Sequence, residues 1–174
     1  MHGYELKRRV VRPSLATVSN NSLYPALRRF EELGAVTVTV EQQEGRPARR
    51  TYRLTEAGAA LLLERASVLP AEKAASDDEF AVRVALFDDV APEARVAILT
   101  ERLAALDAKL ATARELAPEH ADPRPGGSRE RAASRRVDVL EDDRRWVAGL
   151  LVEEGGTPRP PGASRPQRVG PSPW

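Results

Sequence analysis

Residues 19–54 place a helix pattern, a glycine stop and a strand pattern in immediate succession, which few folds can accommodate. Residues 19–22 read Ser-Asn-Asn-Ser, four consecutive residues that favour a helix N-cap. They precede apolar residues at spacings of four, three and three, a pattern that predicts one buried helix face: Leu23, Leu27, Phe30 and Leu33. Pro25 is expected within the first turn. Gly34 is predicted to end the helix, because glycine tolerates the positive φ required just after a helix.

A β-hairpin is predicted directly after this helix. Residues 36–41 alternate strictly between apolar and polar, which is typical of a half-buried strand. Residues 51–54 predict a second short strand with Tyr52 and Leu54 on one side. The polar residues 42–50 include Gly45 and Pro47 and are expected to form a loop with a basic tip: Arg46, Arg49 and Arg50.

The first third of the chain therefore has the element order of a winged helix-turn-helix. A short helix at residues 2–11 and a polar connection at 14–21 precede the helix and hairpin. An α-helix fits the major groove of B-DNA, and a hairpin tip reaches phosphates or the minor groove. The candidate DNA contacts are Asn20, Asn21, Ser22, Tyr24 and Arg28 on the helix and Arg46 and Arg49 on the hairpin.

Each contact also has a purely structural interpretation. Tyr24 would equally suit packing against the preceding helix, and Arg28 would suit a solvated surface position. Ser22 would equally serve only as a helix cap.

The second half is predicted to be helical. Thr55 caps a helix reaching about residue 67, and another helix starts at Asp77 or Asp78. Pro92 opens a long helix whose apolar residues repeat at alternating spacings of three and four: Val96, Leu99, Leu103, Leu106, Leu110 and Ala113. A last helix over about residues 132–154 carries Trp146 and Leu150.

This heptad seam predicts packing against another helix. A reader of palindromic DNA needs two heads about one helical turn apart, so we expect homodimerisation through Val96, Leu99, Leu103, Leu106, Leu110, Trp146 and Leu150. An intrachain helical bundle is the alternative. Trp146 would be interface core.

These patterns give a mainly α fold class with a small β-hairpin, an N-terminal winged helix-turn-helix followed by a helical dimerisation domain. We expect the first domain at residues 1–66 and the second at 67–154, with a flexible loop at 117–131. The Pro- and Gly-rich residues 155–174 are predicted to be a disordered tail.

Composition excludes several classes. The chain has no cysteine and two histidines, so neither a disulfide nor a structural zinc site is expected, and no metal or cofactor is predicted. It carries no nucleophile motif or phosphate-binding glycine loop, so an enzyme is not expected. No signal peptide or membrane span is apparent, and a cytoplasmic location is expected. Residues 1–65 contain 11 basic and 7 acidic residues, which suits a polyanion partner.

Four motifs in sequence resemble the PadR family of transcriptional regulators. They are the His-Gly-Tyr-Glu-Leu of residues 2–6, the Ser-Leu-Tyr-Pro-Ala-Leu of 22–27, the Glu-Glu-Leu-Gly of 31–34 and the run at 45–58 that ends Thr-Glu-Ala-Gly. The resemblance implies a repressor that binds a palindromic operator in double-stranded DNA as a homodimer. It also implies that Tyr24 and Arg28 lie on the recognition helix and Arg46 and Arg49 on the wing.

Two further expectations come from the resemblance. Family members usually carry an apolar helix before the His-Gly-Tyr motif, and here Met1 directly precedes that motif, so a helix is expected upstream of the given start. The resemblance further implies a small aromatic effector that releases the repressor, and Trp146 would alternatively line the pocket for it. The competing hypothesis is a winged-helix module that binds proteins and has no specific affinity for DNA.

Overall fold

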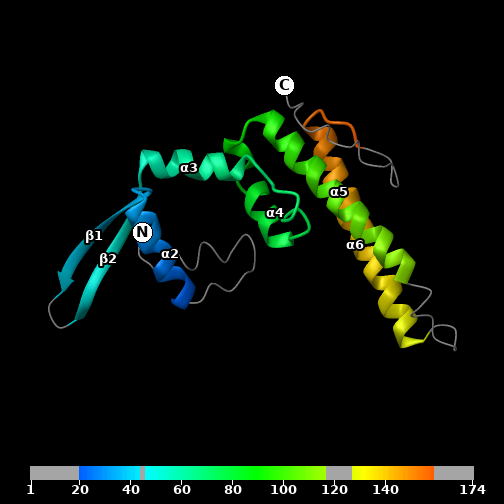
Figure 1. The fold of residues 1–174 in the computed structure, drawn as a ribbon, viewed down its shortest axis with the longest axis horizontal. Coiled ribbons are helices and arrows are strands. Elements are labelled where there is room, and N and C mark those ends of the chain that lie inside the picture. The colour runs from blue at the N-terminus through cyan, green and yellow to red at the C-terminus, as the bar shows by residue number, and fades with distance from the viewer. Residues whose placement is uncertain (1–19, 44–45, 117–126, 159–174) are drawn as a thin grey trace, which may run out of the picture. The chain divides into compact units, whose positions relative to one another are not determined.

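The computed structural model describes residues 20–43, 46–116 and 127–158. It is mostly helical with one two-stranded antiparallel sheet, which confirms the predicted fold class (Figure 1). The described residues divide into two compact units: those up to 69 together with 76–95 form the first, and 70–75 together with those from 96 onward form the second. The predicted helix at residues 2–11 lies outside the described residues.

Helix α2 (Asn20–Glu32) forms where the cap run and the apolar spacing predict it. Leu23 and Leu27 are buried, but Phe30 and Leu33 are 43% and 60% exposed, so the predicted apolar face is buried only along its first half. The reason is that only this half faces the sheet, where Leu23 and Leu27 form a small core with Tyr52.

Gly34 ends α2 in the predicted way. Its φ is +67°, and its N–H donates to the carbonyl of Glu31 at 2.9 Å. The N–H of Ala35 donates to the carbonyl of Phe30 at 2.8 Å. These two bonds form a Schellman motif, which satisfies carbonyls that the end of a helix leaves without a partner.

The hairpin is longer than predicted. Strand β1 (Val36–Gln43) pairs antiparallel with β2 (Arg46–Leu54), so the predicted loop at residues 42–50 is wrong. A ladder of backbone hydrogen bonds does not require apolar side chains, and it continues through this polar stretch. Pro47, which argued for a loop, falls at the register shift opposite residues 41–43, and a bulge tolerates a residue without an N–H.

Three further helical segments complete the first unit. Helix α3 (Glu56–Ala66) begins at the predicted cap Thr55, and α4 (Asp77–Val84) is capped by Ser76. A 3-10 turn, η1 (Phe87–Asp89), follows. Arg83 is buried on α4 and ties it to the preceding segment, because its Nε donates to the carbonyl of Val68 at 2.8 Å.

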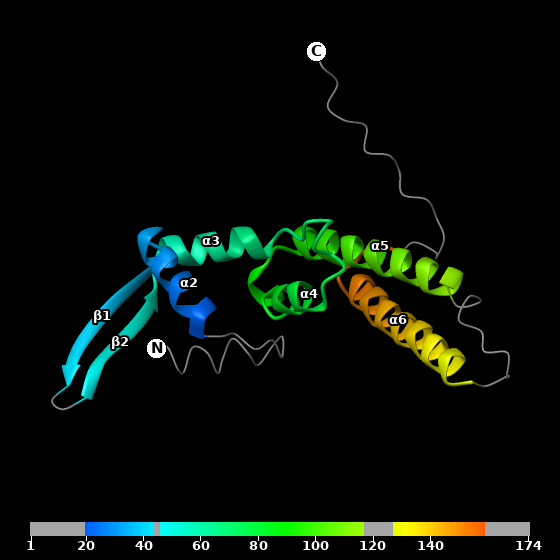
Figure 2. The same cartoon turned by 60° about the horizontal axis from the view of Figure 1, so that its bottom comes forward.

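The second unit is built on two long antiparallel helices, α5 (Pro92–Leu116) and α6 (Ser128–Glu153), which lie side by side in both views (Figure 2). Ion pairs connect them: Arg144 Nε lies 2.5 Å from Asp107 Oδ1, and Arg114 Nη2 lies 2.6 Å from Glu141 Oε1. Because α6 begins at Ser128, the loop predicted to extend to residue 131 is too long. The Gly and Pro residues that predicted it end at Gly127.

The heptad seam of α5 is buried within a single chain. Leu99, Leu103, Leu106 and Leu110 are at most 5% exposed, and α6 contributes Leu140, Val147 and Leu151 to the same interior. These four leucines are therefore covered by their own chain, as the alternative of an intrachain helical bundle predicts. They cannot by themselves form the face toward a second chain. Val96 and Leu150 are partly exposed, and Trp146 is 55% exposed.

No helix among the described residues is both long enough and apolar enough to cross a membrane.

Candidate nucleic-acid interface

The exposed face of α2 carries one row of polar side chains. Asn21, Tyr24 and Arg28 stand three and four residues apart, so they lie above one another on the helix surface. All three are exposed, and Tyr24 is 47% exposed. We call these three residues the α2 row. It faces away from Leu23 and Leu27, which bind α2 to the hairpin.

The α2 row matches the needs of a helix that reads base edges. An amide, a phenol and a guanidinium supply donors and acceptors, and arginine can make two parallel bonds to guanine. Among the described residues, none forms a hydrogen bond or ion pair with the side chain of Asn21, Tyr24 or Arg28. The helix against which Tyr24 would alternatively pack lies outside the described residues, so the role of Tyr24 stays a prediction.

The first turn of α2 also suits a phosphate. It contains no acidic residue, so nothing opposes the partial positive charge of the helix N-terminus. Asn20 opens the helix, and Ser22 is exposed on a neighbouring row with Arg29. Pro25 lies deeper in the helix than the predicted first turn, and because it has no N–H the carbonyl of Asn21 loses its helical donor.

The hairpin extends away from α2 within the first unit (Figure 1). Arg50 and Arg53 are exposed along β2, opposite Val40 and Thr37. Arg46 is the first residue of β2, and Arg49 pairs with Glu41. The structure thus places both predicted wing arginines in the strand next to the hairpin tip, and not in a loop.

One junction fixes α2, the hairpin and α3 relative to one another. We call Gly34, Ala35, Thr55 and Gly58 the Ala35 junction. The Thr55 N–H donates to the Ala35 carbonyl at 3.1 Å, and its Oγ1 donates to the Gly34 carbonyl at 2.7 Å. The same Oγ1 accepts from the Gly58 N–H at 2.9 Å as the cap of α3.

Gly58 allows this junction to close. A Cβ at this position would stand 1.9 Å from the Ala35 carbonyl oxygen, far inside any allowed contact. The sequence identified Thr55 as a helix cap but did not indicate that it also binds the end of α2. The available clue was Gly58 itself, because glycine inside a helix costs stability and usually has a packing reason.

The predicted site residues thus form two groups. Asn21, Tyr24 and Arg28 come together on α2. Arg46 and Arg49 lie on strand β2 of the hairpin.

Comparison with known proteins agrees with this geometry. Residues 1–64 match the sequence model of a family described as the transcriptional regulator PadR-like family, which confirms the resemblance inferred from the four motifs. The match covers the helix and the hairpin and ends within α3. No match was found among curated proteins.

Solved structures share low identity with the chain. PadR of Bacillus subtilis in complex with operator DNA is 17% identical, with 88% of this chain and 91% of that chain covered and a TM-score of 0.40. The same protein with p-coumaric acid is 17% identical, with 89% and 90% covered and a TM-score of 0.41. A Streptococcus mutans protein is 19% identical, with 87% and 90% covered and a TM-score of 0.36.

Proposed function

We propose that this chain, whose residues 1–64 belong to the PadR-like family of transcriptional regulators, is a sequence-specific repressor that binds a palindromic operator as a homodimer. The observation that carries the proposal is the α2 row of Asn21, Tyr24 and Arg28, exposed on a helix whose opposite side is fastened to the hairpin. In this proposal α2 lies in the major groove of the operator, and repression follows from occupation of that site.

The residues have distinct roles in this proposal. Arg28 and Asn21 read base edges, and Tyr24 packs on the groove wall or bonds to a phosphate. Asn20 and Ser22 hold a phosphate at the N-terminus of α2. Arg46 and Arg49 act from the wing, where charge toward the phosphate backbone raises affinity without adding sequence information.

Replacing Arg28 by alanine is expected to weaken binding to the operator duplex by about 5- to 150-fold, while affinity for a scrambled duplex falls by only about threefold. The reason is that a base contact contributes only on the correct sequence. Fluorescence anisotropy with both duplexes measures the two changes. Arg29→Ala is the matched control, because Arg29 carries the same charge on a neighbouring row of α2. Equal losses on both duplexes would remove Arg28 from base recognition.

Replacing Arg46 by alanine is expected to weaken binding to both duplexes alike and to reduce the slope of log affinity against log salt by about one unit. A phosphate contact releases counterions whatever the sequence. Titrations at several salt concentrations give the slope, and Arg46→Lys should restore it because the charge remains. An unchanged slope in the alanine variant would show that Arg46 does not contact a phosphate.

The homodimer in this proposal uses the outer side of α6. Trp146 and Leu150 stand four residues apart, and Val139 lies two turns before Trp146 on the same side. Trp146 is 55% and Val139 37% exposed, whereas Leu99, Leu103, Leu106 and Leu110 of the predicted set are already covered within the chain. Val96 remains a further candidate, because it is only partly buried.

Trp146→Asp is expected to raise the dimer dissociation constant by about 30-fold or more, since buried tryptophans dominate interface energies. Sedimentation velocity over a dilution series measures the constant. Val152→Asp is the matched control, because Val152 is 58% exposed on another side of the same helix and should leave the constant unchanged. A dimer that tolerates the charge at residue 146 would exclude this side of α6.

A further inference from the structure

Helix α6 begins with a strongly basic stretch, residues 128–136, which contains four arginines and one acidic residue. We call it the basic start of α6. Ser134 stands within it, three residues after Arg131 and directly before Arg135 and Arg136, and all four side chains are exposed. Arginines at these positions are what a basic-directed serine kinase selects, because acidic side chains of such a kinase form charge-assisted bonds with guanidinium groups.

The Ser134 hydroxyl is not engaged by the backbone of its own helix. Hydroxyls within helices often bond back to the carbonyl four residues earlier. Thr112 of α5 does so, donating to the Ala108 carbonyl at 3.2 Å, and Thr100 donates to the Val96 carbonyl at 2.7 Å. Among the described residues, none forms a hydrogen bond with the Ser134 side chain. The Ser134 Oγ is therefore available to an enzyme.

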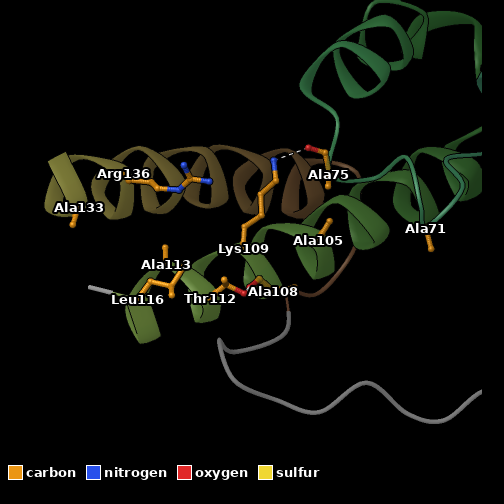
Figure 3. A pocket seen from close by; sticks show the side chains of 10 residues that line it. All are labelled: Ala71, Ala75, Ala105, Ala108, Lys109, Thr112, Ala113, Leu116, Ala133 and Arg136. Atoms are coloured by element: carbon orange, nitrogen blue, oxygen red, sulfur yellow. Dashed lines mark hydrogen bonds between the residues drawn. The ribbon is translucent and has the colours of Figure 1, made fainter. Parts of the chain in front are cut away.

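The basic start of α6 can open without disturbing the core. An intact helix is about 10–12 Å wide, so entry of Ser134 into a kinase cleft requires local unwinding. The first buried side chain of α6 is Leu140, and residues 128–136 are exposed apart from the half-buried Ala133. A hollow of about 620 Å³ separates this stretch from α5 and residues 70–75, and Ala133 and Arg136 line it on α6 (Figure 3). Such loosely packed helix ends open locally at little cost.

We propose that Ser134 is a phosphorylation site for a serine kinase that uses ATP and selects arginine on both sides of the serine. The Ser134 Oγ attacks the γ-phosphorus of ATP and forms a new O–P bond, while the bond from that phosphorus to the β,γ-bridging oxygen breaks. The hydroxyl proton passes to a carboxylate of the kinase, and ADP leaves with the electron pair of the broken bond. Four arginines and Glu130 give the basic start of α6 a charge of +3, which the phosphate lowers to about +1.

Ser134 lies outside the dimer face proposed above. Ser134 and Trp146 are 12 residues apart on α6, which at about 100° per residue places them about 120° apart around the helix axis. Phosphorylation therefore does not require the dimer to dissociate. The proposal is also independent of DNA binding, because neither α2 nor the hairpin contributes to the site.

The test incubates the full chain with Mg²⁺, ATP and the catalytic fragment of protein kinase C, which selects basic residues on both sides of a serine. Mass spectrometry of peptides locates the phosphate, and we expect one per chain, on Ser134. Arg131→Gln should lower the initial rate by about tenfold or more, because a charge-assisted bond to the kinase is lost. Arg145→Gln is the matched control, an exposed arginine about three turns further along α6, and should leave the rate unchanged.

Two further comparisons test the site itself. Ser134→Ala should abolish incorporation, and the variant keeps its helix because alanine favours helices. Thr112 also follows a basic residue, Lys109, by three positions, but its hydroxyl is bonded to its own helix and we expect no phosphate there. The proposal is overturned if the chain takes up no phosphate while the kinase modifies its reference peptide, if Ser134→Ala leaves incorporation unchanged, or if Arg131→Gln behaves like Arg145→Gln.

Discussion

Gly58→Ala is expected to lower the free energy of unfolding of the first unit by about 3 kcal/mol or more, the upper range for overpacking a tight site. The new Cβ would stand 1.9 Å from the Ala35 carbonyl oxygen, which is backbone and cannot rotate away. That carbonyl also accepts the Thr55 N–H, so any shift that relieves the clash breaks a second bond of the Ala35 junction. Urea unfolding followed by circular dichroism measures the loss.

Hydrogen exchange should place this loss in β1, β2 and α3 and leave the protection of α5 and α6 intact. The control is Gly149→Ala on α6, where an added Cβ meets nothing within 4 Å. There the same substitution should stabilise the chain by about 0.5–1 kcal/mol, because alanine favours a helix over glycine. The close approach of α3 to Ala35 would be contradicted if Gly58→Ala left stability within 0.5 kcal/mol of the unsubstituted chain.

Leu106→Ala is expected to lower the free energy of unfolding of the second unit by about 3 kcal/mol. Leu106 of α5 is fully buried within its own chain, and removing its side chain leaves a cavity in addition to the lost apolar burial. The loss should persist when the chain is monomeric, because the residue is covered by its own chain. Urea unfolding of the Trp146→Asp variant, with and without Leu106→Ala, measures it under that condition.

Leu116→Ala is the matched control for Leu106→Ala. It makes the same change on the same helix at a residue that is 42% exposed, and it should cost less than about 1 kcal/mol. If Leu106→Ala had no effect on the monomer and acted only on the dimer, the seam of α5 would lie between chains and the intrachain packing would be wrong.

The local elements of this chain could be predicted because they depend on neighbouring residues. The Schellman end of α2 needs only a glycine at residue 34, and the α3 cap needs only a threonine at residue 55. The start of α5 at Pro92 follows from the fixed φ of proline, which suits the first helical residue. For these elements sequence and structure agree to within a residue or two.

The errors occurred where tertiary contacts decide. Periodicity placed Phe30 and Leu33 on the same face as Leu23 and Leu27, but the hairpin covers only the first part of that face. A heptad seam predicts packing without naming the partner, so the sequence left open whether a second chain or the same chain covers Leu106, which is fully buried within its own chain. The polar composition of residues 42–50 likewise led to a prediction of strands that are too short. The strands continue through most of these residues, because the hydrogen bonds of a β-ladder do not depend on side-chain polarity.

The candidate site was predictable in part. Spacing alone places Asn21, Tyr24 and Arg28 on one row, and the structure adds that this row is exposed and faces away from the core. The Ala35 junction, which positions α2 against the hairpin, was not predictable, because it joins the Thr55 hydroxyl to the Gly34 carbonyl, 21 residues away in the chain. The hollow beside the basic start of α6 was missed for the same reason, since three separate segments form it.

The proposed function requires that the first unit recognises a specific DNA sequence. Its most direct test is fluorescence anisotropy of the full chain against the duplex upstream of its own gene and against a scrambled duplex, at two salt concentrations. We expect a preference of about 10³-fold or more for the native duplex, with affinity for both duplexes falling steeply as salt rises. Equal affinity for the two duplexes from a folded dimer would contradict it and favour a winged helix that binds a protein.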